Sequence, residues 1–232
     1  MKLDHFVVQR PTSIPAQLFL LFHGAGDNPV AMGQIGSWFA ESFPGALVVS
    51  IGAPESGSEH GRQWFPTDNL TDESLQCRVD AMMDSFVGSV HHWQQESGVK
   101  AEATALIGFS QGSIMVLEGI KARPGLAGRV VAFSGRFASL PQRATRRTTV
   151  HLIHGDYDDL VPLKYAQQGE AKLLELGGDV TLNVVEDLAH AIDHRAMQYA
   201  LDHLHYTVPK RYFDEALSGS TPGDEDVIAL MH

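Results

Sequence analysis

A serine enclosed by glycines is the first feature of this sequence with the means to do chemistry. Residues 108–112 read Gly-Phe-Ser-Gln-Gly, with apolar runs over 104–107 before them and over 114–117 after them. These runs predict a buried strand and a helix packed against a sheet. Ser110 then lies at a sharp strand-to-helix turn, where glycine two residues away on either side avoids a collision. We interpret Ser110 as a nucleophile; the alternative is a glycine-rich turn with an incidental serine.

A serine hydroxyl is a weak nucleophile near neutral pH and needs an imidazole to accept its proton. The imidazole in turn needs a carboxylate on its other nitrogen, which fixes the tautomer and stabilises the imidazolium. His190 is the candidate base, because it follows the last predicted strand in a loop from which it can reach the serine. His194, one helical turn later, is its nearest rival.

Three aspartates are candidates for the carboxylate. Asp156, Asp158 and Asp159 crowd the loop after another predicted strand, which puts the residue types in the chain order Ser, Asp, His. Two of the three are expected to shape the loop by accepting hydrogen bonds from backbone N–H groups. Spacing alone does not select the acid among them.

The negative charge that develops during acyl transfer needs hydrogen-bond donors beside the serine. The turn directs the backbone N–H of Gln111 and the N-terminus of the following helix toward that position. Residues 23–27, His-Gly-Ala-Gly-Asp, follow a strand, and their glycines let the backbone come close to a ligand. His23 there, and His154 before another glycine, are expected to fasten their loops.

Strands that alternate with helices must position these residues. Apolar runs predict strands over 4–8, 17–22, 46–51, 104–107, 129–133, 149–153 and 180–185, and the spacing of apolar residues predicts helices over 30–42, 72–95, 163–176 and 191–206. This alternation predicts an α/β fold with a mostly parallel sheet and helices on both faces. We expect a single domain over 1–217 and a flexible C-terminal tail over 218–232.

Composition limits the classes of partner. The chain has 232 residues, 44% of them hydrophobic and 19% charged, and its formal net charge of -11 argues against nucleic acid as a partner. A local basic cluster is expected to be a solvated loop; it comprises Arg136, Arg143, Arg146 and Arg147.

Cysteine usage and hydropathy predict the compartment. The single cysteine, Cys77, allows no internal disulfide, which is consistent with a reducing compartment. No apolar run is long enough for a signal peptide or a membrane span. We therefore expect a cytoplasmic protein without stable membrane association. The twelve histidines are scattered without a local metal motif, and hydrolysis by a serine requires no metal or organic cofactor.

Four separated motifs carry a family resemblance. Residues 23–27, the Trp64-Phe65 pair, residues 108–112 and the stretch 154–162, His-Gly-Asp-Tyr-Asp-Asp-Leu-Val-Pro, together resemble the phospholipase/carboxylesterase family of small α/β-hydrolases, which includes acyl-protein thioesterases. The resemblance covers 17–206 and implies an α/β-hydrolase fold without a separate lid domain.

The resemblance also implies roles for individual residues. It makes Ser110 the nucleophile, His190 the base and Asp158 the acid, and it forms the oxyanion hole from the backbone N–H groups of Ala25 and Gln111. One departure concerns the acid. The family usually has proline directly after it, and this chain has Asp159 there.

These features predict a serine carboxylesterase that hydrolyses small to medium acyl esters through an acyl-enzyme, with thioesters as a further substrate class. The long stretch 52–69 is expected to be an ordered loop. The expected substrate pocket is lined by residues from loops at the catalytic edge, namely Trp64, Phe65, Phe137, Leu160 and Val161. The expected partner is a small-molecule acyl ester, and the sequence does not predict the oligomeric state.

Other activities remain as alternatives. Acyl-protein thioesterase or lysophospholipase activity is the first, and a non-catalytic binding module on the same scaffold is the second. A dienelactone-hydrolase-like enzyme would call for cysteine in place of Ser110, and a peptidase of this fold usually brings an extra domain for which the chain has no room.

Overall fold

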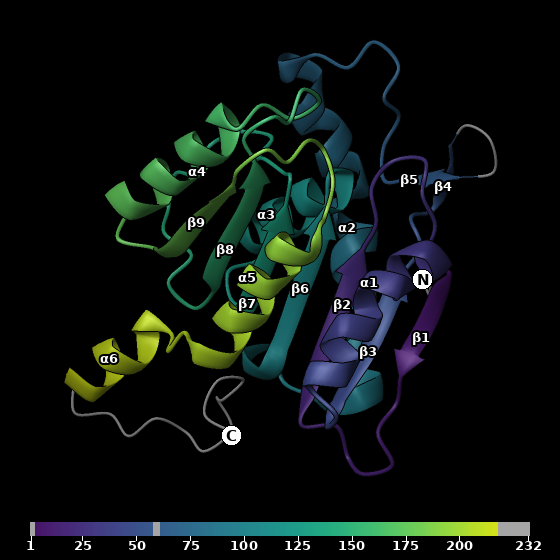
Figure 1. The fold of residues 1–232 in the computed structure, drawn as a ribbon, viewed down its shortest axis with the longest axis vertical. Coiled ribbons are helices and arrows are strands. Elements are labelled where there is room, and N and C mark those ends of the chain that lie inside the picture. Colours follow the sequence, from purple (N-terminus) through teal and green to yellow (C-terminus); the bar gives the residue numbers. More distant parts are fainter. Residues whose placement is uncertain (1–2, 58–60, 218–232) are drawn as a thin grey trace.

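A seven-stranded sheet forms the centre of the computed structural model, which describes residues 3–57 and 61–217 (Figure 1). The strand order is β1-β3-β2-β6-β7-β8-β9, with β1 antiparallel to β3 and every other neighbouring pair parallel. The strands are β1 (His5–Gln9), β2 (Gln17–Phe22), β3 (Ala46–Ile51), β6 (Thr104–Phe109), β7 (Arg129–Phe133), β8 (Thr149–Gly155) and β9 (Asp179–Val185). The mostly parallel sheet is as predicted.

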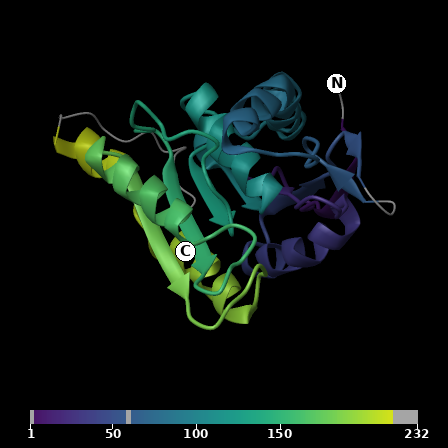
Figure 2. The same cartoon turned by 90° about the horizontal axis from the view of Figure 1, so that it is seen from above.

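Helices cover both faces of the sheet (Figure 2). They are α1 (Pro29–Ser42), α2 (Asp72–Ser97), α3 (Gln111–Ala122), α4 (Lys164–Glu175), α5 (His194–Tyr206) and α6 (Lys210–Leu217). One apolar cluster joins the sheet to α2, α3 and α4, and a second joins it to α1 and α5. Strand β2 supplies both, because Leu18 and Leu20 enter the first cluster while Phe19 and Leu21 enter the second. This double burial explains its continuous apolar sequence.

Strand register brings the chemically interesting loops to one edge of the sheet. Phe22 pairs with Gly108, so the His-Gly-Ala stretch after β2 emerges beside the turn that contains Ser110. On the other side, β8 ends at Gly155, which pairs with Val185 at the end of β9. The loops that follow β2, β6, β8 and β9 therefore leave the same edge, which is where α/β sheets bind ligands.

Several elements differ from the sequence predictions. A small antiparallel pair, β4 (Glu55–Ser56) and β5 (Arg62–Gln63), interrupts the stretch predicted as one loop. A 3₁₀ turn at Ala101–Ala103 and helix α6 were also not predicted. Helix α5 begins at His194 instead of 191, because Asp193 caps it by accepting a 2.8 Å hydrogen bond from Ala196 N–H.

The division into a domain over 1–217 and a tail over 218–232 stays a prediction, because the tail lies outside the described residues. Among the described residues, no lid domain is set apart from the sheet and its helices. No helix in that part of the chain is both long and apolar enough to cross a membrane.

Candidate active site

Ser110 lies in a backbone conformation that few residues adopt. Its φ of 54° and ψ of -116° put a non-glycine residue in a region that costs about 1–3 kcal/mol. The flanking glycines explain how the turn closes. A Cβ on Gly112 would lie 1.9 Å from the carbonyl oxygen of Phe22, and a Cβ on Gly108 would lie 2.5 Å from Gly112 C. The predicted strand-to-helix turn is present, and only glycine fits at both positions.

The hydroxyl of Ser110 is left available for chemistry. Ser110 occupies the N-cap position of α3, where a serine usually accepts a hydrogen bond from the first helical turn, yet its side chain makes no such bond. The backbone N–H of Ser110 donates to Phe133 O at 3.1 Å, which ties the turn to the end of β7. The residue is half-buried at the positive end of the α3 dipole.

Asp158 and His190 meet across the loops that follow β8 and β9. His190 Nδ1 donates to Asp158 Oδ2 at 2.8 Å, and the Asp158 side chain has no exposed surface. Asp158 Oδ1 accepts from the N–H groups of Leu160 and Val161 at 3.0 and 2.8 Å. These bonds hold the carboxylate in one orientation, and its bond to Nδ1 leaves Nε2 of a neutral His190 as a proton acceptor.

The other two aspartates of this loop are exposed and do not contact His190. Burial and hydrogen bonding therefore favour Asp158 over Asp156 and Asp159 for the acid. The two loops are also tied by their backbones, since Tyr157 N–H donates to Leu188 O at 3.0 Å. Gly155 permits this approach, because a Cβ there would lie 2.0 Å from the same Leu188 oxygen.

The imidazole of His190 lies beside the serine turn. Its ring centroid is 4.9 Å from that of Phe109, the residue before Ser110. Gly24, after β2, borders the same place, since a Cβ on it would lie 3.2 Å from the Phe109 ring and 3.3 Å from Ser110 Cβ. The structure thus brings the loops containing Ser110, His190, Asp158 and Gly24 together, and the catalytic roles of these residues stay a prediction.

The remaining candidate histidines lie elsewhere or bond to their own loops. His194, the rival base, stands at the start of α5 with its ring 5.5 Å from that of Trp38. Buried His154 lies 2.6 Å from Val161 O through Nε2, and that nitrogen is also 3.4 Å from Asp158 Oδ2. Burial lowers the pKa of His154, as it does the pKa of His23, so both are expected to be neutral. Sequence spacing gave no sign that His154 approaches the carboxylate.

The residues predicted to line a substrate pocket have different surroundings. Trp64 and Phe65 are fully buried in the apolar cluster beneath α2 and α3, which gives them a supporting position instead of contact with a substrate in this conformation. Phe137 is also buried, against α4. Leu160 is 75% exposed and Val161 is partly exposed, so contact of these two with a substrate stays a prediction.

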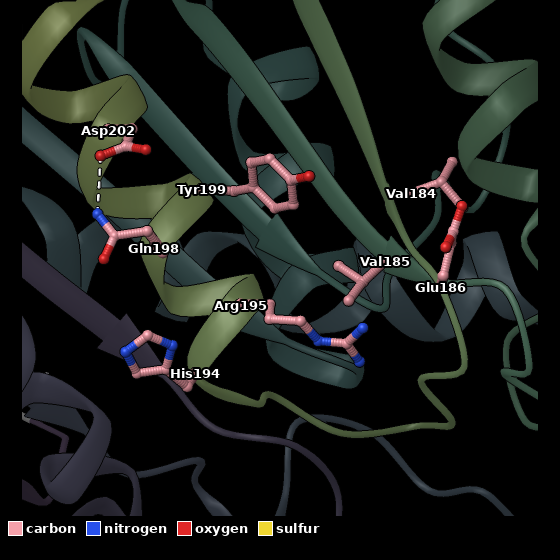
Figure 3. Close-up of a pocket in the computed structure, with 8 residues that line it drawn as sticks. All are labelled: Val184, Val185, Glu186, His194, Arg195, Gln198, Tyr199 and Asp202. Atoms are coloured by element: carbon pink, nitrogen blue, oxygen red, sulfur yellow. Dashed lines mark hydrogen bonds between the residues drawn. The ribbon is translucent and has the colours of Figure 1, made fainter.

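A pocket of about 570 Å³ lies between the end of β9 and helix α5 (Figure 3). None of the residues predicted to line a substrate pocket lines it. Its lining is polar and apolar in similar measure; the eight residues are Val184, Val185, Glu186, His194, Arg195, Gln198, Tyr199 and Asp202. Arg195 is held by Asp193 at 2.8 Å, next to the loop that contains His190. Ser110, Asp158 and His190 do not line this pocket.

The basic cluster that was predicted to be solvated is only partly so, because Arg136 makes contacts with other elements. Arg136 contacts Asp72 at 2.8 Å, and its guanidinium stacks on the Tyr165 ring at 3.8 Å. These contacts join the first turns of α2 and α4 near the catalytic edge. Among residues 3–57 and 61–217, no cluster of three or more His, Cys, Asp or Glu side chains is arranged to hold a metal ion.

A mostly parallel sheet with a strained serine turn, an acid after a later strand and a histidine after the last strand defines the α/β-hydrolase fold in its serine form. Within that class the chain belongs to the phospholipase/carboxylesterase family, whose model matches residues 3–208. The resemblance predicted from the four motifs is confirmed.

Individual relatives agree with this assignment. The chain is 62% identical to the esterase YpfH of Escherichia coli over 232 residues, which covers 100% of both chains. It is 33% identical over 200 residues to an acyl-protein thioesterase 1 of Emericella nidulans, covering 75% of this chain and 83% of the relative. The crystal structure of esterase PE8 superimposes with a TM-score of 0.79 at 26% identity, covering 88% of this chain and 98% of that one.

Proposed function

We propose that this protein is a serine carboxylesterase that hydrolyses small to medium acyl esters through an acyl-enzyme intermediate. The observation that carries the proposal is the 2.8 Å hydrogen bond from His190 to the buried carboxylate of Asp158, formed beside the strained turn of Ser110. A nucleophile, a base and an acid arranged in this order perform acyl transfer in serine hydrolases. The family relationship and the likeness to an esterase at 62% identity support the same activity.

The proposed reaction begins with attack of Ser110 Oγ on the acyl carbonyl while His190 Nε2 accepts the hydroxyl proton. Asp158 stabilises the imidazolium that forms, and the backbone N–H groups of Ala25 and Gln111 donate to the developing oxyanion. Collapse of the tetrahedral intermediate releases the alcohol, which takes the proton from His190. Water then attacks the acyl-enzyme with His190 as base, and the acid leaves as Ser110 regains its proton.

A small-molecule acyl ester is the proposed substrate. The described residues include no lid domain over the catalytic edge, and the exposed side chains of Tyr157 and Leu160 give that edge an apolar border. An accessible site of this kind suits acyl chains of small to medium length. The cytoplasmic location, the lack of a nucleic-acid partner and the lack of stable membrane association stay predictions from the sequence.

A series of p-nitrophenyl esters from acetyl to palmitoyl tests this proposal. The wild type should turn over a range of these esters with an optimum below the longest chains, and Ser110→Ala should lose a thousandfold or more in rate, because triad members act as a unit. Equal rates in wild type and Ser110→Ala would contradict the proposal.

Thioester hydrolysis is the second candidate function, supported by the likeness to an acyl-protein thioesterase at 33% identity. The same residues serve both reactions, because only the leaving group differs. Oxygen and sulfur esters of one acyl group, compared through kcat/KM, separate the two candidates. A lysophospholipid in the same assay tests the remaining alternative.

A further inference from the structure

The two proposed oxyanion donors are held in different ways. Gln111 is the first residue of α3, so helical hydrogen bonding fixes its backbone. Ala25 lies in the loop after β2, and within the described part of the chain its N–H donates to no other group. The next N–H along, that of Gly26, is occupied by Arg62 O at 2.8 Å. Some other contact must therefore orient the peptide that contains the Ala25 N–H.

The imidazole of His23 contacts that peptide. Ala53 N–H donates to His23 Nε2 at 3.0 Å, so this nitrogen is an acceptor and the ring proton lies on Nδ1. His23 Nδ1 then donates to Gly24 O at 2.7 Å, which is the shorter of two bonds to that oxygen, since Asp27 N–H also donates to it at 3.3 Å. His23 has no exposed surface, and burial lowers its pKa, which keeps the ring in the neutral form that both bonds require.

Gly24 C=O and Ala25 N–H belong to one planar trans peptide, in which the two groups point in opposite directions. A hydrogen bond that holds Gly24 O toward the His23 ring therefore directs the Ala25 N–H away from that ring. Polarisation of the carbonyl also strengthens the same N–H as a donor. Gly24 borders Ser110, with only 3.3 Å between Ser110 Cβ and the position of a Cβ on Gly24. The peptide is therefore next to the nucleophile.

Trp64 fixes the preceding peptide in the same manner. Its indole Nε1 donates to His23 O at 3.0 Å, which orients the His23–Gly24 peptide. The Gln111 side chain then holds the Trp64 loop, because its Oε1 accepts from Trp64 N–H and its Nε2 donates to Phe65 O, both at 2.8 Å. These buried contacts connect the loop after β2 to the residue whose own N–H is the other proposed donor.

We propose that His23 is a positioning residue for the oxyanion hole, which sets the direction of the Ala25 N–H through Gly24 O, with Trp64 and the Gln111 side chain holding the same loop. This inference rests on the proposed function, because it assigns a purpose to the donors of that reaction. It also explains why a tryptophan in a surface loop is buried and hydrogen-bonded.

Two substitutions of His23 separate its two bonds. Asparagine places an amide donor near the position of Nδ1, so His23→Asn retains the bond to Gly24 O and loses the bond from Ala53. Glutamine reaches the position of Nε2, so His23→Gln retains the Ala53 bond and loses the Gly24 bond. Because loss of an entire oxyanion donor costs about 10²–10³ in kcat, His23→Gln should lower kcat by about tenfold to a hundredfold, and His23→Asn should restore most of it.

Trp64→Phe tests the second peptide, because it keeps the buried ring and removes the indole donor to His23 O. Trp93→Phe is the matched control, since Trp93 is buried in the same apolar cluster on α2. We expect Trp64→Phe to lower kcat by about tenfold with KM unchanged. Trp93→Phe should leave kcat within about twofold of wild type although it also changes a buried ring.

The inhibition constant of an alkyl trifluoromethyl ketone distinguishes a role in the oxyanion hole from a merely structural role. Its adduct with Ser110 places an oxyanion in the hole, so its Ki should rise in proportion to the fall in kcat/KM across the His23 and Trp64 variants. Equal losses of kcat in His23→Gln and His23→Asn, or an unchanged Ki, would overturn the inference. The proposed function would still hold in that case if the wild type were active and Ser110→Ala inactive. A wild type inactive toward all esters and unreactive with the ketone would overturn both.

Discussion

Asp158 and His190 form a 2.8 Å hydrogen bond from loops that follow neighbouring strands, although 32 residues separate them in the chain. Two backbone N–H groups hold the other carboxylate oxygen, so the acid does not depend on the histidine for its orientation. This arrangement holds the His190 ring beside the serine turn, 4.9 Å from the Phe109 ring, and its bond to Asp158 occupies Nδ1 and not Nε2.

Replacement of Asp158 by Asn should abolish most of the activity. The amide can still accept from Leu160 and Val161 but favours the wrong tautomer of His190, so kcat should fall by about 10³–10⁴ with little change in KM. Asp156→Asn and Asp159→Asn are the controls, because both residues are exposed in the same loop. Steady-state kinetics of the three variants test this assignment. A loss of activity confined to Asp159→Asn would show that Asp159, and not Asp158, is the triad acid.

His154 should be needed for stability of the acid loop. Its Nε2 donates to Val161 O at 2.6 Å in a buried setting, so His154→Leu leaves that carbonyl without a partner and should lower the free energy of unfolding by about 1–3 kcal/mol. His154→Gln keeps a donor near the same position and should lose less. Urea unfolding measures the difference, and equal losses in the two variants would show that the hydrogen bond is not responsible.

Stability should decrease as the solution becomes acidic. His151, on β8 and fully buried against His203 of α5, has its pKa lowered well below the ordinary value by burial and by neighbouring Arg129. The unfolded chain therefore binds a proton near pH 6.5 that the folded chain does not, so this contribution is complete above that pH and is lost as pH falls, by at most about 1.4 kcal/mol per pH unit.

Urea midpoints between pH 7.5 and 5.0 test this titration. His151→Gln should flatten the pH dependence, whereas His91→Gln, at an exposed position, should leave it unchanged. His23, His154 and His203 also have pKa values lowered chiefly by burial and contribute in the same direction. An increase in the free energy of unfolding as the pH falls from 6.5 to 5.0 would contradict this prediction.

Two glycines should respond to alanine in opposite ways. Gly112→Ala places a Cβ 1.9 Å from Phe22 O, which forces the serine turn away from β2 and should lower both stability and activity. Gly88, inside α2, has no atom within 4 Å of an added Cβ, so Gly88→Ala should stabilise by about 0.5–1 kcal/mol through helix propensity. Thermal unfolding and ester hydrolysis measure both effects, and similar melting temperatures for the two variants would be the contrary result.

Most of the sheet was predictable from local sequence. Strands such as β2 and β3 are buried on both faces, so continuous apolar runs identified them with their observed bounds. The pair β4 and β5 has two residues per strand, which is too short for any periodic signal. The start of α5 was placed three residues early, because the apolar pattern does not indicate that Asp193 acts as the cap.

The candidate site was predictable in its residue types and less so in its contacts. The spacing of glycines around Ser110 reflects a steric demand of the turn itself, so it was visible in the sequence. Spacing did not select Asp158 among the three aspartates, and the family resemblance alone singled it out. Its contact with a histidine 32 residues away comes only from the fold. Trp64 was predicted to line a pocket, but its indole donates to His23 O and its ring packs in the core.

Acylation of Ser110 is the step on which the proposed reaction depends. A fluorophosphonate reacts with an activated serine, so intact mass measurement followed by peptide mapping identifies the nucleophile directly. We expect one adduct per chain, located on Ser110, formed much more slowly in Asp158→Asn and absent in Ser110→Ala. Labelling of Ser110→Ala at the wild-type rate, or an adduct on another residue of the wild type, would contradict the account.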